Sequence, residues 1–383
     1  MTPIFSLTLL AFAVLNGAGA HPGHSAKQEA AERYAFMKRN PASVRSCASN
    51  LSRRGHVAQS LVRRQQFAES ARAKQGLPGI SRRDFAEYNV SHASDKDFTF
   101  GDDELDFFKD NSTCILQPEV TQGPYYVDGE LIRSNIVEDQ EGVPVYLEVQ
   151  LIDTSSCEPV PAVFMDMWHC NSTGVYSGVS ASGNGNDEDT TNIDNTFLRG
   201  IQQTDINGVA QFETVFPGHY TGRASHIHIL AHAANETTVR TNGTLLGGNF
   251  TTHAVHVGQL FFDQDLISQV EGTAPYNTNT QDTTLNSDDD ILASEADDMD
   301  PFVQYILLGD SVSDGLLAWI SIGIDPSADN EVTAAATHYD GYGVANSDTG
   351  MGGGAPSGGA MPSGDTPTGM PSKSAAPSAG SGV

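Results

Sequence analysis

The stretch Val145-Tyr146-Leu147-Glu148-Val149-Gln150-Leu151 places an aliphatic side chain at every second position. This period of two is typical of a β-strand with one buried face and one polar face. Similar strands are expected at five further segments, residues 162–168, 210–215, 226–232, 255–262 and 302–308. Gly, Pro, Asn and Asp separate these segments, and no helical pattern lies between them. The sequence therefore predicts a mostly β fold, either a sandwich or a barrel.

Two polar segments interrupt the strands, and a tail of low sequence complexity follows them. Residues 180–195 and 265–300 interrupt the strand pattern, and we expect both to be long loops. Residues 341–383 are mainly Gly, Ser, Pro and Met, a composition that buries too little apolar surface to fold. We therefore expect one β domain at residues 114–340, which is long enough for a sizeable core, followed by a disordered tail.

The region before the β domain, residues 21–113, is expected to be a basic and largely helical arm. Residues 26–39 and 57–74 space their apolar side chains at helical intervals, which predicts two or three helices. Paired basic residues recur in the arm, at 38–39, 53–54, 63–64 and 82–83. We interpret these pairs as solvated charge on exposed helices, with proteolytic processing as the alternative.

The amino-terminal residues predict export. An apolar run at 4–15 precedes Ala18-Gly19-Ala20, the pattern of a signal peptide at 1–20, so the secreted chain is expected to begin at His21. The run is shorter than the roughly 20 apolar residues that span a bilayer, and no membrane partner is expected. The cysteines allow up to two disulfides in three pairings that the sequence leaves open: Cys47, Cys114, Cys157 and Cys170. Seven sequons predict a secreted glycoprotein, at Asn50, Asn89, Asn111, Asn171, Asn235, Asn242 and Asn249.

The formal net charge of −28 is unevenly distributed along the chain. Residues 1–96 hold 14 Lys and Arg against 6 Asp and Glu, whereas the remainder holds 6 against 42. The acidic main body would repel phosphates, so no nucleic-acid partner is expected.

The segment 217–228, Pro-Gly-His-Tyr-Thr-Gly-Arg-Ala-Ser-His-Ile-His, carries the strongest chemical signal. On a strand, His226 and His228 point to the same face, so both imidazoles can bind one ion while Ile227 packs on the other side. Such a pair alone is weak, and zinc would be its default metal. The initial Pro-Gly predicts a turn, after which Tyr220 and Arg223 lead into the strand.

Together with three other segments, this motif resembles the intradiol ring-cleavage dioxygenases, the family of catechol and protocatechuate dioxygenases, and most closely their secreted fungal branch. The family's Pro-Gly-x-Tyr turn and Arg-x-x-His-x-His segment match residues 217–228. Its second tyrosine motif matches Trp-His-Cys-Asn-Ser-Thr-Gly-Val-Tyr at 168–176. Gln259 precedes an aromatic strand, and Gly-Pro-Tyr-Tyr lies at 123–126, both as in the family. Tyr220 and His226 are only six residues apart, a shorter loop than in the bacterial members, which predicts a more open pocket.

The resemblance implies a transthyretin-like β-sandwich that holds one Fe(III) per chain. Its metal ligands would be Tyr176, Tyr220, His226 and His228. The other implied roles are a base at Tyr220, stabilisation of the anionic substrate by Arg223, orientation of the substrate by Gln259, and pocket walls at Tyr125 and Tyr126. Anionic oxygen donors favour Fe(III) over Fe(II), in agreement with such a site.

The implied substrates are a small aromatic diol and O₂. The ring would open between the two hydroxyl-bearing carbons and give a muconate-type dicarboxylic acid. The sequence leaves open whether the protein forms a homodimer.

Two other function classes stay open at this point. A zinc hydrolase or lyase would use His226, His228 and a third histidine such as His169 or His253. A secreted transthyretin-like carrier would bind aromatic ligands in the sandwich without chemistry.

Overall fold

A computed structural model describes residues 47–78, 123–181, 183–186, 188–247, 252–296 and 301–346. All of them belong to a unit that extends to Met351, and a second unit, residues 352–383, lies outside the described residues. The expected signal peptide at 1–20, the expected helix at 26–39 and residues 347–383 of the expected tail also lie outside them.

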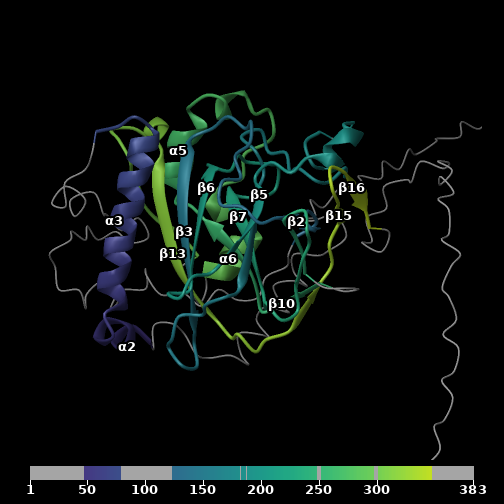
Figure 1. The fold of residues 1–383 in the computed structure, drawn as a ribbon. Coiled ribbons are helices and arrows are strands. Elements are labelled where there is room, and N and C mark those ends of the chain that lie inside the picture. Colours follow the sequence, from purple (N-terminus) through teal and green to yellow (C-terminus); the bar gives the residue numbers. More distant parts are fainter. Residues whose placement is uncertain are drawn as a thin grey trace, which may run out of the picture. The chain divides into compact units, whose positions relative to one another are not determined.

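Two four-stranded sheets face each other across one apolar core (Figure 1). The first sheet consists, in spatial order, of β12 (Gln304–Leu307), β13 (Leu316–Ile324), β3 (Pro144–Asp153) and β6 (Val209–Val215). The second consists of β11 (His256–Phe261), β7 (His226–His232), β4 (Phe164–Trp168) and β5 (Arg199–Gln203). Neighbouring strands are antiparallel except β13 and β3, which are parallel. The predicted β-sandwich is confirmed.

The strands with alternating sequences were the ones that could be predicted. The segment 226–232 is β7 with both ends as expected, and the five other expected strands overlap β3, β4, β6, β11 and β12. Strand β13 was missed because its sequence, Leu-Leu-Ala-Trp-Ile-Ser-Ile-Gly-Ile, is apolar almost throughout and has no period of two. A strand between two others and covered on both faces has this composition.

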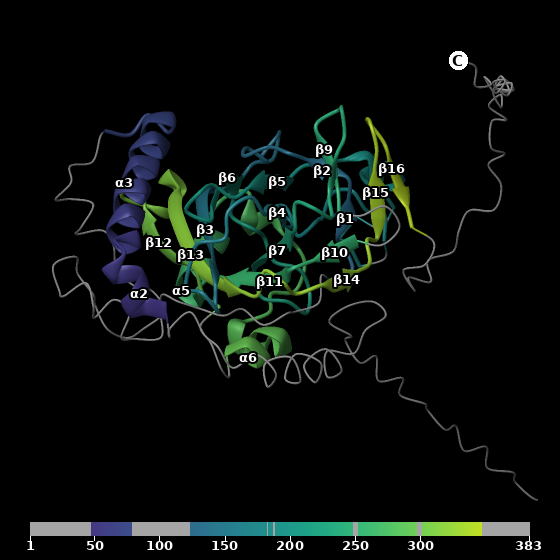
Figure 2. The same cartoon turned by 60° about the horizontal axis from the view of Figure 1, so that its bottom comes forward.

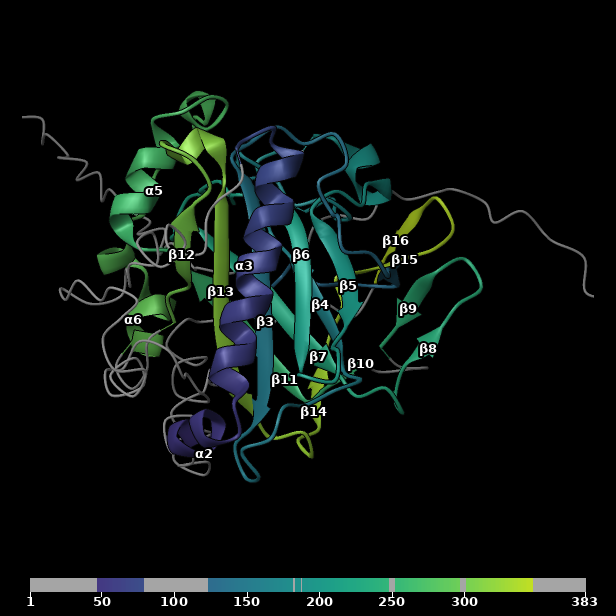
Figure 3. The same ribbon diagram turned by 60° about the vertical axis from the view of Figure 1, so that its left-hand side comes forward.

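Helix α3 (His56–Lys74) covers the outer face of the first sheet, as Figure 3 shows. Phe67 of α3 meets the ring of Tyr146 edge-on, with the centroids 5.7 Å apart. Because of this cover, β3 is buried on both faces, and the expectation of a half-buried strand was wrong. Among the described residues, no helix has the length and apolar character needed to cross a membrane.

A buried carboxylate joins α3 to β3. Glu148 is fully buried and accepts hydrogen bonds from Arg63 Nε at 3.0 Å, from Arg64 Nε at 2.9 Å and from Gln211 Nε2 at 2.9 Å. The guanidinium of Arg64 also lies over the ring of Trp319, 5.1 Å from its centroid. The interpretation of the 63–64 pair as solvated charge was therefore wrong, because these arginines neutralise an acidic side chain that the helix covers.

A disulfide between Cys47 and Cys157 ties the short helix α2 (Ala48–Arg53) to the turn after β3. It links residues 110 apart in sequence, so it connects the amino-terminal arm covalently to the sandwich. Cys170 is a buried thiol, and Cys114 lies outside the described residues. The structure thus selects one of the pairs that the sequence left open.

The two expected loops contain helices. The segment 265–300 carries most of α5 (Gln264–Glu271), two 3-10 turns at Tyr276–Thr278 and Asn286–Asp288, and α6 (Asp290–Ala296). Helix α5 begins where the Asp263 side chain accepts the backbone N–H of Leu266 at 2.8 Å. Its apolar residues Leu266, Ile267 and Val270 are buried, so the loop expectation was wrong for this segment. The segment 180–195 keeps its loop character apart from a 3-10 turn at Thr190–Asp194.

Short strands cover the outer face of the second sheet, opposite α3 (Figure 2). They are β1 (Val127–Asp128), β2 (Glu130–Leu131), β8 (Thr238–Val239), β9 (Thr244–Leu246), β10 (Thr252–Ala254), β14 (Asn330–Val332), β15 (Ala336–His338) and β16 (Gly343–Ala345). A 3-10 turn at Val312–Asp314 precedes β13. The predicted site residues lie beneath this cover.

The described chain continues past the expected start of the tail. Strand β16 pairs antiparallel with β15, and the backbone N–H of Gly343 donates to Asp194 Oδ1 at 2.9 Å. Asn346 then donates through Nδ2 to the carbonyl of Ala334, also at 2.9 Å. Residues 341–346 therefore belong to the folded unit, and the tail boundary at 341 was set too early.

A pair of truncations tests this boundary. A chain that ends at Asn346 should melt within about 1 °C of the full chain, because the Gly, Ser and Pro composition beyond it offers nothing to pack. A chain that ends at Tyr342 loses β16 and should melt roughly 3 to 6 °C lower. Calorimetry on both chains measures the difference, and equal melting temperatures for the two truncations would contradict it.

The Glu148 contacts predict a stability effect that depends on pH. Burial alone would raise the pKa of Glu148, but Arg64 and Arg63 outweigh burial, and the pKa lies below its usual value of 4.5. A carboxylate with a lowered folded pKa stabilises the protein above its unfolded pKa, and this contribution disappears as the pH falls through the folded pKa. Glu148→Gln should therefore cost roughly 2 to 4 kcal/mol of unfolding free energy at neutral pH, and the cost should shrink below about pH 4.

The control for this variant is Glu213→Gln, which removes an exposed ion pair between the sandwich and Lys74 of the same helix. Exposed pairs contribute little, so the control should lose less than about 1 kcal/mol. Urea unfolding at several pH values gives both numbers. A Glu148→Gln cost that is independent of pH, or equal to that of the control, would contradict the prediction.

Candidate active site

Four predicted ligand atoms converge on one point. His226 Nε2 lies 3.3 Å from Tyr176 Oη, 3.2 Å from Tyr220 Oη and 3.0 Å from His228 Nε2. All four side chains are at most 8 % exposed. Two donors bound to one cation at about 2 Å lie roughly 3 Å apart, so these distances fit a shared metal ion.

Strand β7 aims both imidazoles at this point. His226 and His228 lie on its outer face, while Ile227 and Ile229 pack in the sandwich core, as the alternation predicted. His226 Nδ1 donates to the carbonyl oxygen of Ala224 at 2.6 Å. This hydrogen bond fixes the tautomer and leaves the Nε2 lone pair directed at the site.

The neighbouring strands place two more side chains beside His228. Trp168 of β4 and Gln259 of β11 are the cross-strand partners of His228 on its two sides. The Trp168 and His228 rings stack with their centroids 4.9 Å apart and their planes 3° from parallel. Cross-strand partners share one face of a sheet, so Trp168, His228 and Gln259 form a row across it.

Tyr176 is held by two buried asparagines from the segment 180–195. Asn184 accepts the Tyr176 N–H and donates to its carbonyl, both at 2.8 Å, and so imitates a neighbouring strand. Asn192 donates to the same carbonyl at 2.8 Å. Gly174, at φ +80°, allows the turn before Tyr176 to touch the chain before Tyr220, because a Cβ there would lie 2.3 Å from the carbonyl oxygen of His219.

A tight turn, and not a strand, carries Arg223. The backbone N–H of Arg223 donates to the Tyr220 carbonyl at 3.2 Å, and Gly222 has a φ of +90°. Arg223 was expected to lead into the strand of His226, and β7 begins only at His226. The turn brings Tyr220 and Arg223 to the same side of the sheet.

Arg223 and Gln259, predicted to act together, are in contact. The Arg223 guanidinium is fully buried, and its NH2 group donates to Gln259 Oε1 at 2.5 Å. Its Nε donates to Asp289 Oδ2 at 2.9 Å, in an ion pair that the sequence did not indicate. Because guanidinium is only a donor, it fixes the orientation of the Gln259 amide, with Oε1 toward Arg223.

The two neighbouring tyrosines have different surroundings. The Tyr125 ring packs against Tyr176 with the centroids 4.8 Å apart. Tyr126 lies against Trp168 at 5.3 Å and His232 at 6.4 Å, and it is 1 % exposed. Tyr125 thus touches a predicted ligand, whereas the ring contacts of Tyr126 are with Trp168 and His232. Their roles as pocket walls stay predictions.

The phenols of the predicted ligands Tyr176 and Tyr220 keep their protons at neutral pH unless a cation replaces them. Burial raises the pKa of Tyr176 well above its ordinary value and that of Tyr220 to about 12. The positive charge of Arg223 lowers the pKa of both phenols but does not outweigh burial. A cation that replaces the two phenolic protons would supply the charge that buried phenolates need, so the donor set fits a highly charged metal ion.

Several proteins resemble this chain. A family model described as "Dioxygenase" matches residues 120–273. An intradiol ring-cleavage dioxygenase from Tetranychus urticae is 30 % identical; the match covers 56 % of this chain and 97 % of that one, with a TM-score of 0.46. Catechol 1,2-dioxygenase from Acinetobacter sp. ADP1 is 17 % identical over 54 % of this chain and 62 % of that one, with a TM-score of 0.35.

A curated catechol 1,2-dioxygenase, from Pseudomonas sp. (strain EST1001), is 26 % identical over 157 residues. The match covers 35 % of this chain and 48 % of that protein, so the chain spans about half the length of this relative. The family model and the 30 % identity over nearly all of the Tetranychus urticae protein decide the family.

The chain belongs to the intradiol ring-cleavage dioxygenases.

The third histidines considered for the zinc alternative, His169 and His253, have other partners in this dioxygenase. Both ring nitrogens of His169 are occupied, Nδ1 by the Cys170 carbonyl at 2.8 Å and Nε2 by Thr214 Oγ1 at 2.7 Å. His253 instead pairs through Nδ1 with Asp329 at 2.6 Å. Within the described ranges, no three His, Cys, Asp or Glu side chains are arranged to hold a metal. The four converging side chains are outside this description because two of them are tyrosines.

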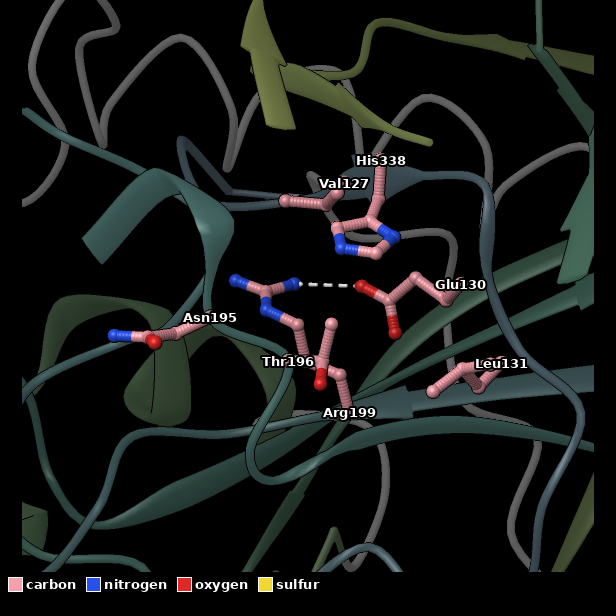
Figure 4. A pocket seen from close by; sticks show the side chains of 7 residues that line it. All are labelled: Val127, Glu130, Leu131, Asn195, Thr196, Arg199 and His338. Carbon is pink, nitrogen blue, oxygen red and sulfur yellow. Dashed lines mark hydrogen bonds and ion pairs between the residues drawn. The ribbon is translucent and has the colours of Figure 1, made fainter. Parts of the chain in front are cut away.

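A small pocket lies on the same face of the second sheet, lined by Glu130, Arg199 and His338 among others (Figure 4). None of the predicted site residues lines it. Arg199, the cross-strand partner of Trp168, pairs with Glu130 at 3.0 Å and donates to the carbonyls of Tyr125 at 2.7 Å and Ser177 at 2.9 Å. Its guanidinium thus fixes the chain beside Tyr176, and we assign the pocket no part in the chemistry.

Sequence reasoning missed the residues that support the ligands: Asn184, Asn192, Arg199 and Asp289. Asn184 and Asn192 occur among Gly, Ser, Asp and Thr residues, where asparagine is expected in a turn. Because their sequence neighbours are polar, nothing indicated that the two asparagine side chains would be buried, each with 1 % exposure.

The hydrogen bonds of Asn184 and Asn192 to the Tyr176 backbone, called the clamp here, can be tested by measuring the free energy of unfolding. Asn184→Ala leaves the N–H of Tyr176 without its partner and weakens the support of its carbonyl, which should cost about 2 to 4 kcal/mol of unfolding free energy. Asn186→Ala, two residues away and half-buried, should cost less than about 0.5 kcal/mol. Urea unfolding of both variants measures the difference, and similar costs would show that the clamp is unimportant.

Proposed function

We propose that the chain is an Fe(III)-dependent intradiol dioxygenase that opens catechol-type rings. The ring carbon–carbon bond between the two hydroxyl-bearing carbons breaks, both atoms of one O₂ enter the product, and a muconate-type dicarboxylic acid forms. Family membership supports the reaction class, and the curated catechol 1,2-dioxygenase relative supports an aromatic diol as the substrate.

The observation that carries this proposal is the convergence of two phenol oxygens and the His228 imidazole nitrogen within 3.3 Å of a second imidazole nitrogen, His226 Nε2. Tyr176, Tyr220, His226 and His228 would hold one iron ion per chain. Anionic oxygen donors favour the ferric state, and iron in this state would supply the charge that binds the diol oxygens and makes the ring reactive toward O₂.

Tyr220 is the proposed proton acceptor for a substrate hydroxyl. It is on the turn before β7, whereas Tyr176 is fixed at its backbone by Asn184 and Asn192. With 8 % exposure against 1 % for Tyr176, Tyr220 is the more accessible of the two phenols. A phenolate oxygen at Tyr220 Oη would take the proton there, as the family resemblance implies.

Arg223 and Gln259 are proposed to handle the anionic substrate. The Arg223 charge is fully buried, and a buried charge acts strongly on negative charge that grows during reaction. Its contact with Gln259 directs the amide Nε2 of Gln259 away from the guanidinium, so Nε2 is the atom proposed to orient the diol. Both groups act on substrate, and neither is needed to hold the ion.

We also propose that this enzyme is exported. The expected signal peptide at 1–20 and the Cys47–Cys157 disulfide support this, because structural disulfides persist in oxidising compartments. The expected substrates outside the cell are small aromatic diols. A non-catalytic carrier would not require two phenols and two imidazoles around one point.

The charge-transfer colour of the iron-loaded protein tests the proposal. Wild type should be red-brown and should convert catechol and O₂ to a dicarboxylic acid. Tyr176→Phe removes one phenolate, so its visible band should shift or bleach and its turnover should fall about 100-fold or more. Tyr342→Phe, on a ring that is 50 % exposed, should leave both unchanged.

Absorption spectra, iron content and product formation for the three proteins give the answer. Full colour and full iron content in Tyr176→Phe would contradict the ligand assignment. A colourless wild type that does not consume catechol would contradict the function.

A further inference from the structure

Asp289 is a buried carboxylate next to the site. It lies in the segment 265–300, beyond residues 120–273 that match the family model, and it is 1 % exposed. Each of its two oxygens has its own partners: Oδ2 faces the site residues, and Oδ1 faces helix α6.

The oxygen Oδ2 contacts the turn that carries Arg223. It accepts from Arg223 Nε at 2.9 Å and from the backbone N–H of Ala224 at 2.8 Å. The guanidinium is thereby held so that its NH2 group meets Gln259. One carboxylate oxygen therefore sets the direction of the buried cation.

The same contact reaches a predicted metal ligand through a single residue, Ala224. Ala224, whose N–H donates to Asp289, accepts with its carbonyl the Nδ1–H of His226 at 2.6 Å. Hydrogen bonds to the outer nitrogen of a ligand histidine fix its ring and raise its basicity. Asp289 thus supports both Arg223 and His226, although it touches neither the ligand atoms nor the substrate position.

The other oxygen anchors the carboxylate to α6. Oδ1 accepts the backbone N–H groups of Ile291 at 2.9 Å and Leu292 at 3.0 Å, as a helix N-cap does. Burial alone would raise the pKa of Asp289, but the Arg223 charge and the backbone donors outweigh it, so the carboxylate remains ionised. The helix start and the ion pair fix its position from two sides.

We propose that Asp289 is a positioning residue of this enzyme, which holds the Arg223 guanidinium toward Gln259 and, through Ala224, the His226 imidazole toward its ligand position. The inference rests on the proposed function. It assigns a role in the reaction to a residue outside the family match, and it gives the segment 265–300 a purpose in the site.

Asp289→Asn separates this role from helix capping. The amide oxygen can still accept from Ile291 and Leu292, and Asn is as good an N-cap as Asp. The amide NH2 then takes the place of Oδ2 and faces two donors, Arg223 Nε and the Ala224 N–H, so both contacts are lost. The exposed neighbour Asp288 provides the control, Asp288→Asn, with the same change of charge.

Steady-state turnover of catechol by the iron-loaded full chain is the first readout. Asp289→Asn should lower kcat about 10- to 100-fold, with KM changed less than about 3-fold because the effect falls on the reaction step. Asp288→Asn should match wild type. The visible band of Asp289→Asn should shift because the His226 support changes, whereas Arg223→Ala should keep the wild-type band.

A double-variant cycle is the second readout. Arg223→Ala alone should lower kcat about 10²- to 10³-fold. If Asp289 acts largely through Arg223, the two substitutions should not add up. The fold-reduction in kcat of the double variant should then be smaller, by at least about 10-fold, than the product of the fold-reductions in the two single variants. Asp289→Ser keeps a capping oxygen without the charge, and it repeats the test if the Asn variant folds poorly.

Three outcomes are distinct. Wild-type kcat and band position in Asp289→Asn, or a lowered melting temperature alone, would overturn the inference and leave the proposed function intact. Multiplicative losses in the cycle would overturn the coupling to Arg223. A wild type without ring cleavage would overturn the proposed function, and the inference with it.

Discussion

The register of β7 between β4 and β11 is the constraint on which the site depends. It places His228 between Trp168 and Gln259 and keeps Ile227 in the core. A slip of one residue would turn both imidazoles into the apolar sandwich and place Ile227 and Ile229 on the outer face, so the buried core enforces the direction of the predicted ligands. The same residues that make the fold stable therefore set the position of the proposed site.

Around that register, buried charges are compensated locally. Arg223 faces Asp289, Arg199 faces Glu130, and Glu148 faces the arginines of α3. An unpaired charge at such sites would be costly, whereas a paired one gives fixed geometry. The predicted ligand phenols of Tyr176 and Tyr220 are neutral while they keep their protons, and a cation that replaced those protons would compensate the charge of the phenolates. The ion that the site is proposed to bind would therefore balance the negative charge of these buried side chains.

The sequence predicted the parts of the molecule that rest on local periodicity or on a contiguous motif. Strand β7 and its two-histidine face follow from the local pattern, and the convergence of Tyr176 with Tyr220 and His226 was implied by the family resemblance of the motifs that carry them. Asp289 was not predictable, because its contact with Arg223 joins residues 66 apart and leaves no local pattern. The cover of β3 by α3 and the apolar strand β13 were missed because burial on both faces removes the alternation.

Resonance Raman spectroscopy of the iron-loaded protein, excited within its visible band, tests the central claim most directly. Tyrosine ring vibrations should be enhanced, with two sets from two different tyrosinates, and one set should disappear in Tyr176→Phe. Enhancement from no tyrosine while iron is bound would contradict the assignment of Tyr176 and Tyr220 as ligands, and with it the account of the site.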